Sequence, residues 1–196
     1  MLIQVVHCHP LQDSYNHALF GAIVETLERG GHQVIATDLY REGFDPVLSA
    51  AERRSYYAPA YDDAAIAAQI GVLRRIDGIV FCFPAWWFSM PALLKGYFDR
   101  VWAPGVAFAH DPAGARIVPR LANVKLFGVV TSYGSPWWLV RWYAGDPCRK
   151  VLRRALKPMC ARDARWFYLA HYDMDRSTPE TRARFLARVQ ARLAQV

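Results

Sequence analysis

The sequence lacks several features that would place it in common functional classes. Its four cysteines show no CxxC spacing, and Cys8 and Cys82 lie in apolar runs typical of buried strands, so nothing calls for an oxidising compartment. The charge-free run over 78–94 contains two prolines and is shorter than the roughly 20 residues of a membrane-spanning helix. The first residues have no basic lead-in and no cleavage signal. We therefore expect a soluble, cytoplasmic protein without membrane insertion.

The charge of the sequence is basic but dispersed. The 196 residues carry 24 Lys and Arg against 17 Asp and Glu, and 54% of them are hydrophobic, which excludes a disordered chain. The basic residues do not gather in one stripe, which argues against a nucleic-acid partner. No repeat, low-complexity stretch or linker divides the sequence, so we expect a single domain over 1–196.

Predicted strands and helices alternate along the sequence. Short, largely apolar runs predict strands at 2–7, 33–38, 78–83, 125–131 and 165–170. Helical spacing of apolar residues predicts helices at 16–29, from 62–63 to just before 78, at 91–102, and at 179–195 with Thr178 as N-cap. Strands that are apolar throughout and alternate with helices predict an α/β domain, with a parallel sheet covered on both faces.

Two familiar kinds of site are missing. The loop that follows the first predicted strand has neither the glycines of GxGxxG nor the lysine of a P-loop, so a Rossmann or NTPase site is not supported. His7 and His9 lie two residues apart on that strand, as a metal pair would. No third ligand occurs at a suggestive spacing, and we predict no metal site.

Three segments follow predicted strands at the edge where ligands bind in parallel sheets. The first opens a helix, whose free N–H groups suit a phosphate, and its polar side chains either bind that phosphate or merely cap the helix. The second is rich in aromatic rings, which suit a flat ligand or else a core or dimer contact. The third combines hydroxyls with a glycine. We expect them to form one crevice from His9, Ser14, Tyr15 and Asn16, from Pro84, Ala85, Trp86, Trp87 and Phe88, and from Thr131, Ser132, Tyr133 and Gly134.

A longer motif covers the second segment. The sequence FPAWWFSMPALLKGYFDRV at 83–101 resembles the FP-x-x-WF-x-x-PA-x-LKG motif of the NAD(P)H:quinone reductases of flavodoxin-like fold, including the bacterial modulator-of-drug-activity type. The segment from His9 to Asn16 is similar to the phosphate loop of that family, and 38–46 is similar to its DLY…F-(D/N)-P segment. The resemblance implies a flavodoxin-like three-layer sandwich whose five-stranded parallel sheet has the order 2-1-3-4-5.

The resemblance also implies a flavin in the crevice, with the isoalloxazine cradled by the second segment and its pyrimidine edge at the third. The segment beginning at Thr178 is similar to one near the adenylate of FAD, which places Arg182 there and favours FAD over FMN. Phe108 and His110 occupy the positions of substrate-lining aromatic hydroxyls, and His110 is the expected proton donor. Family members are homodimers, and the stretch over 137–143 suits the interface.

One departure from the family concerns the groups that support the reduced flavin in animal members. Trp138 lies near the position of a tyrosine and Ala144 at that of a histidine, so this relay is either absent or replaced by Tyr143 or Tyr133. The implied reaction passes hydride from NAD(P)H to the flavin, then two electrons to a quinone-like acceptor, by a ping-pong mechanism. Two other functions stay open. One is a regulatory subunit of a potassium-efflux antiporter, and the other is a flavodoxin-type electron carrier, which the net charge of +7 disfavours.

Overall fold

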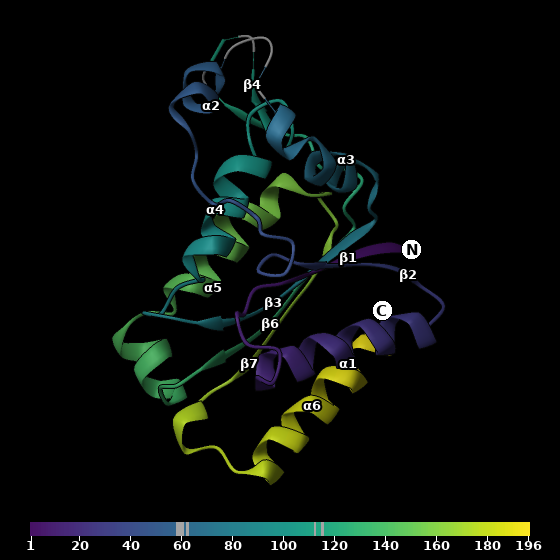
Figure 1. Cartoon of the computed structure of the whole chain (residues 1–196), viewed down its shortest axis with the longest axis vertical. Coiled ribbons are helices and arrows are strands. Elements are labelled where there is room, and N and C mark those ends of the chain that lie inside the picture. Colours follow the sequence, from purple (N-terminus) through teal and green to yellow (C-terminus); the bar gives the residue numbers. More distant parts are fainter. Residues whose placement is uncertain (58–60, 62, 112, 115) are drawn as a thin grey trace.

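A five-stranded parallel sheet forms the centre of the protein. The computed structural model describes residues 1–57, 61, 63–111, 113–114 and 116–196 (Figure 1). The strands lie in the order β2-β1-β3-β6-β7, which is the predicted order 2-1-3-4-5 once the additional strands are counted. Their bounds are Leu2–His7 for β1, Gln33–Asp38 for β2, Gly78–Ala85 for β3, Leu126–Tyr133 for β6 and Arg165–His171 for β7.

Three strands run further than the sequence predicted, β7 by one residue and β3 and β6 by two. β3 and β6 each continue two residues beyond the expected ends, because Pro84 and Ala85 still pair in register with Ser132 and Tyr133. The prediction placed all four of these residues in loops, and the structure corrects it. Their backbones belong to the sheet, so the edge of the sheet itself forms part of the crevice.

Helices cover both faces of the sheet (Figure 1). On one face, Leu19 and Val189 pack against Ile3, and on the other, Leu94 and Leu152 pack near Phe81. The N-caps follow the sequence, since the Ser14 and Thr178 hydroxyls accept the N–H groups of His17 and Thr181. The first face carries α1 (Tyr15–Arg29) and α6 (Pro179–Leu193); the second carries α3 (Ala67–Arg75), α4 (Ala92–Val101) and α5 (Pro147–Val151).

Several short elements were not predicted. The helix expected from 62–63 is instead a 3₁₀ turn, η1 (Ala64–Ile66), followed by α3, and Asp62 lies outside the described residues. A two-stranded antiparallel sheet joins β4 (Phe108–His110) to β5 (Ile117–Pro119). These pieces are too short to repeat an apolar period, so periodicity could not reveal them. The other unpredicted elements are α2 (Ala50–Ser55), η2 (Leu139–Tyr143), α5, η3 (Leu152–Leu156), η4 (Lys157–Met159) and η5 (Met174–Arg176).

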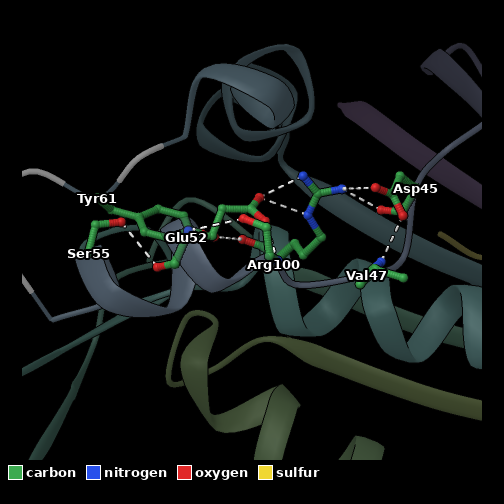
Figure 2. Close-up of polar contacts among 7 residues, drawn as sticks. Asp45, Val47, Glu52, Ser55, Tyr61 and Arg100 are labelled. Carbon is green, nitrogen blue, oxygen red and sulfur yellow. Dashed lines mark hydrogen bonds and ion pairs between the residues drawn. The ribbon is translucent and has the colours of Figure 1, made fainter.

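A buried ion pair fastens α2 to α4 (Figure 2). Arg100 donates from Nη2 and Nε to Glu52 Oε1 at 2.6 and 2.9 Å, and both side chains are 6% exposed. Arg100 also donates to the Asp45 carbonyl, and the Tyr61 hydroxyl donates to the Arg100 carbonyl at 3.2 Å. Buried charges require this kind of full pairing. The pair therefore fixes the segment from Asp45 to Ser55 against α4.

Within the described part of the chain, no helix is both long and apolar enough to cross a membrane.

Candidate functional site

A cavity of about 440 Å³ opens at the carboxyl ends of β3 and β6. Its walls come from the ends of these two strands and from the segment after β7. The second and third predicted segments therefore meet, as the sequence analysis expected. Among the described residues, the lining consists of Pro84, Ala85, Trp86, Trp87, Ser132, Gly134, Ser135, Met174 and Asp175.

The aromatic segment is held in a tight turn. Trp86 and Ser89 exchange backbone hydrogen bonds at 2.9 and 3.0 Å, and the two residues between them, Trp87 and Phe88, have φ angles of 51° and 58°. Positive φ at both central positions is the geometry of a type I′ turn, which favours Asn-Gly. Aromatic residues there carry a steric cost, and such strain concentrates at functional sites. Trp87 is also 95% exposed, so packing does not require its ring at this position.

The first predicted segment lies beside the aromatic turn. The ring of His9 is 6.0 Å from that of Trp86, and its Nδ1 contacts the backbone N and O of Leu11 at 3.1 and 3.2 Å. Ser14 serves as the N-cap of α1, because its Oγ accepts the His17 N–H at 3.1 Å. The capping role accounts for Ser14. His9 is the side chain of this segment that lies nearest the aromatic turn.

Tyr15 and Asn16 bind other parts of the protein. The side chain of Asn16 is buried and donates to Ser132 Oγ at 2.8 Å, which joins α1 to the end of β6. The Tyr15 hydroxyl donates to the Arg182 carbonyl at 2.8 Å, and burial raises the pKa of Tyr15 to about 12. The Arg182 guanidinium in turn donates to the carbonyl and hydroxyl of Ser177 at 3.2 and 2.9 Å. These contacts place Arg182 next to the first segment, although neither it nor Tyr15 lines the cavity.

The third predicted segment is mostly buried. The Tyr133 hydroxyl shares a 2.7 Å hydrogen bond with that of Tyr168, its ring stacks on Tyr172, and burial raises its pKa well above the usual range. Thr131 is fully buried, and its hydroxyl has no hydrogen-bond partner among the described residues. Gly134 allows a close approach, since a Cβ there would lie 2.6 Å from Asp175 Oδ2. That approach brings the segment after β7 into the cavity.

Four predicted site residues lie elsewhere in the chain. Phe108 lines a second, mainly apolar cavity of about 280 Å³ beside α4, and the exposed ring of His110 is 5.6 Å from that of Tyr57. Trp138 and Tyr143 are exposed at η2, on the surface. None of the four lines the cavity at the ends of β3 and β6. Within one chain, the predicted substrate and proton-donor residues are therefore separate from the predicted flavin residues.

The sequence analysis missed the side chains that follow β7. Met174 and Asp175 line the cavity, and so does Ser135, one residue beyond the third predicted segment. The signal was available, because the carboxyl end of the fifth strand meets the same edge of the sheet as the others. The predicted crevice included only the segments after the first, third and fourth strands. Asp175 adds a carboxylate that none of those three segments supplied.

Comparison with known proteins agrees with this architecture. The family model described as flavodoxin-like fold matches residues 1–193. The chain is 35% identical over 112 residues to the uncharacterized NAD(P)H oxidoreductase YcaK of Escherichia coli (strain K12), and the match covers 54% of the chain and 55% of that protein. It is 31% identical over 122 residues to NAD(P)H dehydrogenase (quinone) 1 of Rattus norvegicus, covering 54% of the chain and 44% of that protein. The chain thus spans about half the length of the curated relatives it matches.

Two solved structures share the fold over almost the whole chain. One is an NAD(P)H:quinone oxidoreductase from Methanothermobacter marburgensis, with a TM-score of 0.85, 24% identity, and coverage of 100% of this chain and 96% of that one. The other is an FMN-dependent NADH-azoreductase from Bacillus anthracis in complex with FMN, with a TM-score of 0.78, 14% identity, and coverage of 99% and 98%. These similarities confirm the resemblance predicted from the motif at 83–101. The chain belongs to the family of proteins with the flavodoxin-like fold.

Proposed function

We propose that this protein is a flavin-dependent oxidoreductase that takes hydride from NAD(P)H and reduces a quinone-like acceptor by two electrons. The observation that carries the proposal is the strained aromatic turn, which presents Trp87 to solvent at the mouth of the cavity. An exposed ring held in an unfavourable backbone conformation is explained by a ligand that stacks on it. The similarity to YcaK and to NAD(P)H dehydrogenase (quinone) 1 supports the same reading.

The residues of the cavity fit a flavin. Trp86 and Trp87 offer aromatic faces for a tricyclic ring, and Asp175 offers an acceptor for an N–H group at the edge of such a ring. Asn16 in the first turn of α1 bonds to Ser132 of the cavity lining, and a helix N-terminus suits a phosphate. Bound flavin would supply the hydride and electron chemistry, while the protein binds the rings, orients them and excludes water.

The cavity residues and the first turn of α1 fit the isoalloxazine and phosphate that FMN and FAD share. FAD requires one further contact, for its adenylate. In the FAD form of the proposal, the adenylate lies at Arg182, which Tyr15 holds beside the first segment. Mass spectrometry of the cofactor released by denaturation distinguishes FAD from FMN. Arg182→Ala is expected to weaken binding of FAD and to leave binding of FMN unchanged.

A second copy of the chain would complete the site. Phe108 and His110 lie away from the cavity of their own chain, and exposed aromatic rings gather at and near η2. A contiguous patch of this kind marks an interaction surface. We place this patch in a homodimer interface that brings His110 of the partner subunit to the acceptor, where its imidazole supplies a proton. The patch consists of Trp137, Trp138, Trp142 and Tyr143.

An absorbance experiment tests the proposed reaction. The purified protein is mixed with excess flavin and desalted, then treated anaerobically with NADPH or NADH, and finally with a quinone. Retained flavin bands that bleach with the nucleotide and return with the quinone are expected. Loss of all flavin on desalting would refute the site. Flavin that stays oxidised with both nucleotides would refute the reductase and favour the carrier or the antiporter regulator.

Two variants and a size measurement sharpen this test. Trp87→Ala is expected to release flavin on desalting, whereas Val47→Ala, which removes an exposed apolar side chain outside the cavity, is expected to retain it. Sedimentation is expected to give a dimer that Trp142→Glu dissociates. His110→Ala is expected to retain flavin and slow only the reoxidation by quinone. A monomeric wild type with full activity would refute the shared site.

A further inference from the structure

Two histidines and an aspartate lie together at the carboxyl ends of β1 and β2. His7 and Asp38 are the last residues of these strands and pair directly in register. His17 lies in the first turn of α1, and the centroid of its ring is 5.4 Å from that of His7. One ligand-capable atom from each side chain lies within 4.8 Å of those of the other two. Strand and helix thus bring together three metal-ligating groups that are far apart in the sequence.

The histidines of this cluster have unused nitrogens. His7 is fully buried, and within the described part of the chain neither of its ring nitrogens has a hydrogen-bond partner; the same holds for His17 Nδ1. Buried polar atoms are rarely left without partners.

Neighbouring groups hold the ligands in place. Phe20 stacks on the ring of His7 with centroids 4.7 Å apart and an interplanar angle of 15°. The backbone N–H groups of Tyr40 and Arg41 donate to Asp38 Oδ1 at 3.1 and 3.2 Å, which orients the carboxylate and, among the described contacts, leaves Oδ2 to face a cation. Orientation of ligands by such outer contacts is typical of metal sites.

We propose that His7, His17 and Asp38 bind a divalent transition-metal ion such as Zn²⁺, with water in the remaining position. Two imidazoles and one carboxylate with an open position form a common ligand set for such ions. Donor atoms on a tetrahedral zinc lie about 3.4 Å apart for bonds of about 2.1 Å, so the side chains close by about 1.4 Å at most.

The sequence around His7 and His9 shows no third ligand at a suggestive spacing, so no metal site was predicted from it. His9 is instead bonded to the backbone of Leu11, and the additional ligands come from β2 and α1. None of the three proposed ligands lines the cavity at β3 and β6, so the proposal does not depend on flavin binding. A bound ion would join β1, β2 and α1 beneath the first segment.

Calorimetric titration of the chelator-treated full chain with ZnCl₂ tests the site. The wild type is expected to bind one ion per chain, and Co²⁺ is expected to give the visible bands of a four- or five-coordinate site. Loss of an outer contact alone costs about 10–100-fold in metal affinity, so His17→Ala and Asp38→Asn are expected to lose at least tenfold. His32→Ala, which changes a histidine outside the cluster, is expected to bind as the wild type does.

Asp38→Asn keeps an oxygen to accept the N–H groups of Tyr40 and Arg41, and His17 is only partly buried, so both variants are expected to fold, as circular dichroism would verify. Zn²⁺ is also expected to raise the melting temperature of the wild type and of His32→Ala, but not that of the cluster variants. Absence of saturable binding to the wild type, or equal binding by the cluster variants, would overturn the proposal. Flavin retention, measured separately, has no bearing on either result.

Discussion

The backbone conformation of Trp87 predicts that two substitutions differ in folding stability although both lose the bound flavin. Its φ of 51° lies in the left-handed region, and its ring is 95% exposed. Removing the ring therefore costs little buried surface, and the stability of a substitution depends mainly on the backbone. We compare Trp87→Gly with Trp87→Ala, because both lose the ring and only glycine adopts this conformation freely.

The expected difference follows from two opposing effects. A left-handed residue other than glycine costs about 1–2 kcal/mol, which Trp87→Ala keeps and Trp87→Gly removes. Glycine also gains freedom in the unfolded chain, which offsets about 0.4–1 kcal/mol of that gain. We expect Trp87→Gly to be more stable than Trp87→Ala by about 0.5–1 kcal/mol, or roughly 2 °C in melting temperature for a chain of this size.

Urea unfolding and thermal melts of the flavin-free proteins measure this difference, and desalting measures flavin retention. Both variants are expected to lose flavin equally, because each lacks the ring. Val47→Ala serves as the control, because it removes an exposed apolar side chain at a position without positive φ, outside both the cavity and the proposed interface. Trp87→Gly no more stable than Trp87→Ala would refute the strain that we assign to this turn.

Four further predictions concern packing, charge and flavin binding. Removing one partner of the buried ion pair, as in Glu52→Ala, is expected to cost about 3–5 kcal/mol in urea unfolding, while Glu52→Leu/Arg100→Met should recover much of it; equal losses in the single and double variants would contradict the pairing. Burial alone would raise the pKa of Glu52, but hydrogen bonds from Ser49 and Arg100 lower it overall, so its stabilising effect is complete above the unfolded pKa near 4.5 and is lost as pH falls through the lower folded value. The pH dependence of unfolding should therefore flatten below pH 5 in Glu52→Leu/Arg100→Met, and an unchanged acid limb would contradict this. Gly134→Ala places a Cβ 2.6 Å from the Asp175 carboxylate, so the carboxylate must move and flavin affinity should fall, whereas Gly21→Ala, with open space around it, should retain flavin and gain helix stability. Gly96→Ala meets the backbone oxygen of Pro46 at 2.3 Å and should destabilise strongly in the same melts, and a melting temperature like that of the wild type would show that α4 does not pack this closely.

The sheet and the long helices were predictable because the residues that each element buries form a regular pattern in its own sequence. Val80 and Phe81 belong to an unbroken apolar strand, and Leu19, Ile23 and Leu27 repeat at helical spacing on one face of α1. Each pattern reports burial directly. α2 carried a different signal, the capping box of Ser49 and Glu52, which marks a helix start without any apolar period. That signal was present in the sequence and was not used.

The candidate site was predictable only for residues that directly follow one predicted strand and therefore lie at the edge of the sheet. Trp86, Trp87 and Gly134 reached the cavity because each follows a buried strand. The cavity role of Asp175 depends on how closely the segment after β7 approaches the end of β6, and the absence of a side chain at Gly134 allows that approach. No local pattern encodes such an approach. The same reasoning applies to Asp38, which meets His7 only through the register of two strands.

The residues of the predicted segments divide by what they contact, and this division decides what their substitution tests. Asn16 and Ser132 bond to each other, and Tyr133 bonds to Tyr168, so these side chains hold α1, β6 and β7 together beneath the cavity. Trp87 instead projects into solvent beside it. Loss of flavin in Asn16→Ala would therefore accompany a lower melting temperature, because the substitution leaves the buried Ser132 hydroxyl without its hydrogen-bond donor. Loss of flavin in Trp87→Gly would instead accompany a melting temperature equal to or higher than that of the wild type. A sequence motif groups these residues as one binding signature, whereas the structure separates the side chains that build the crevice from those that face a ligand.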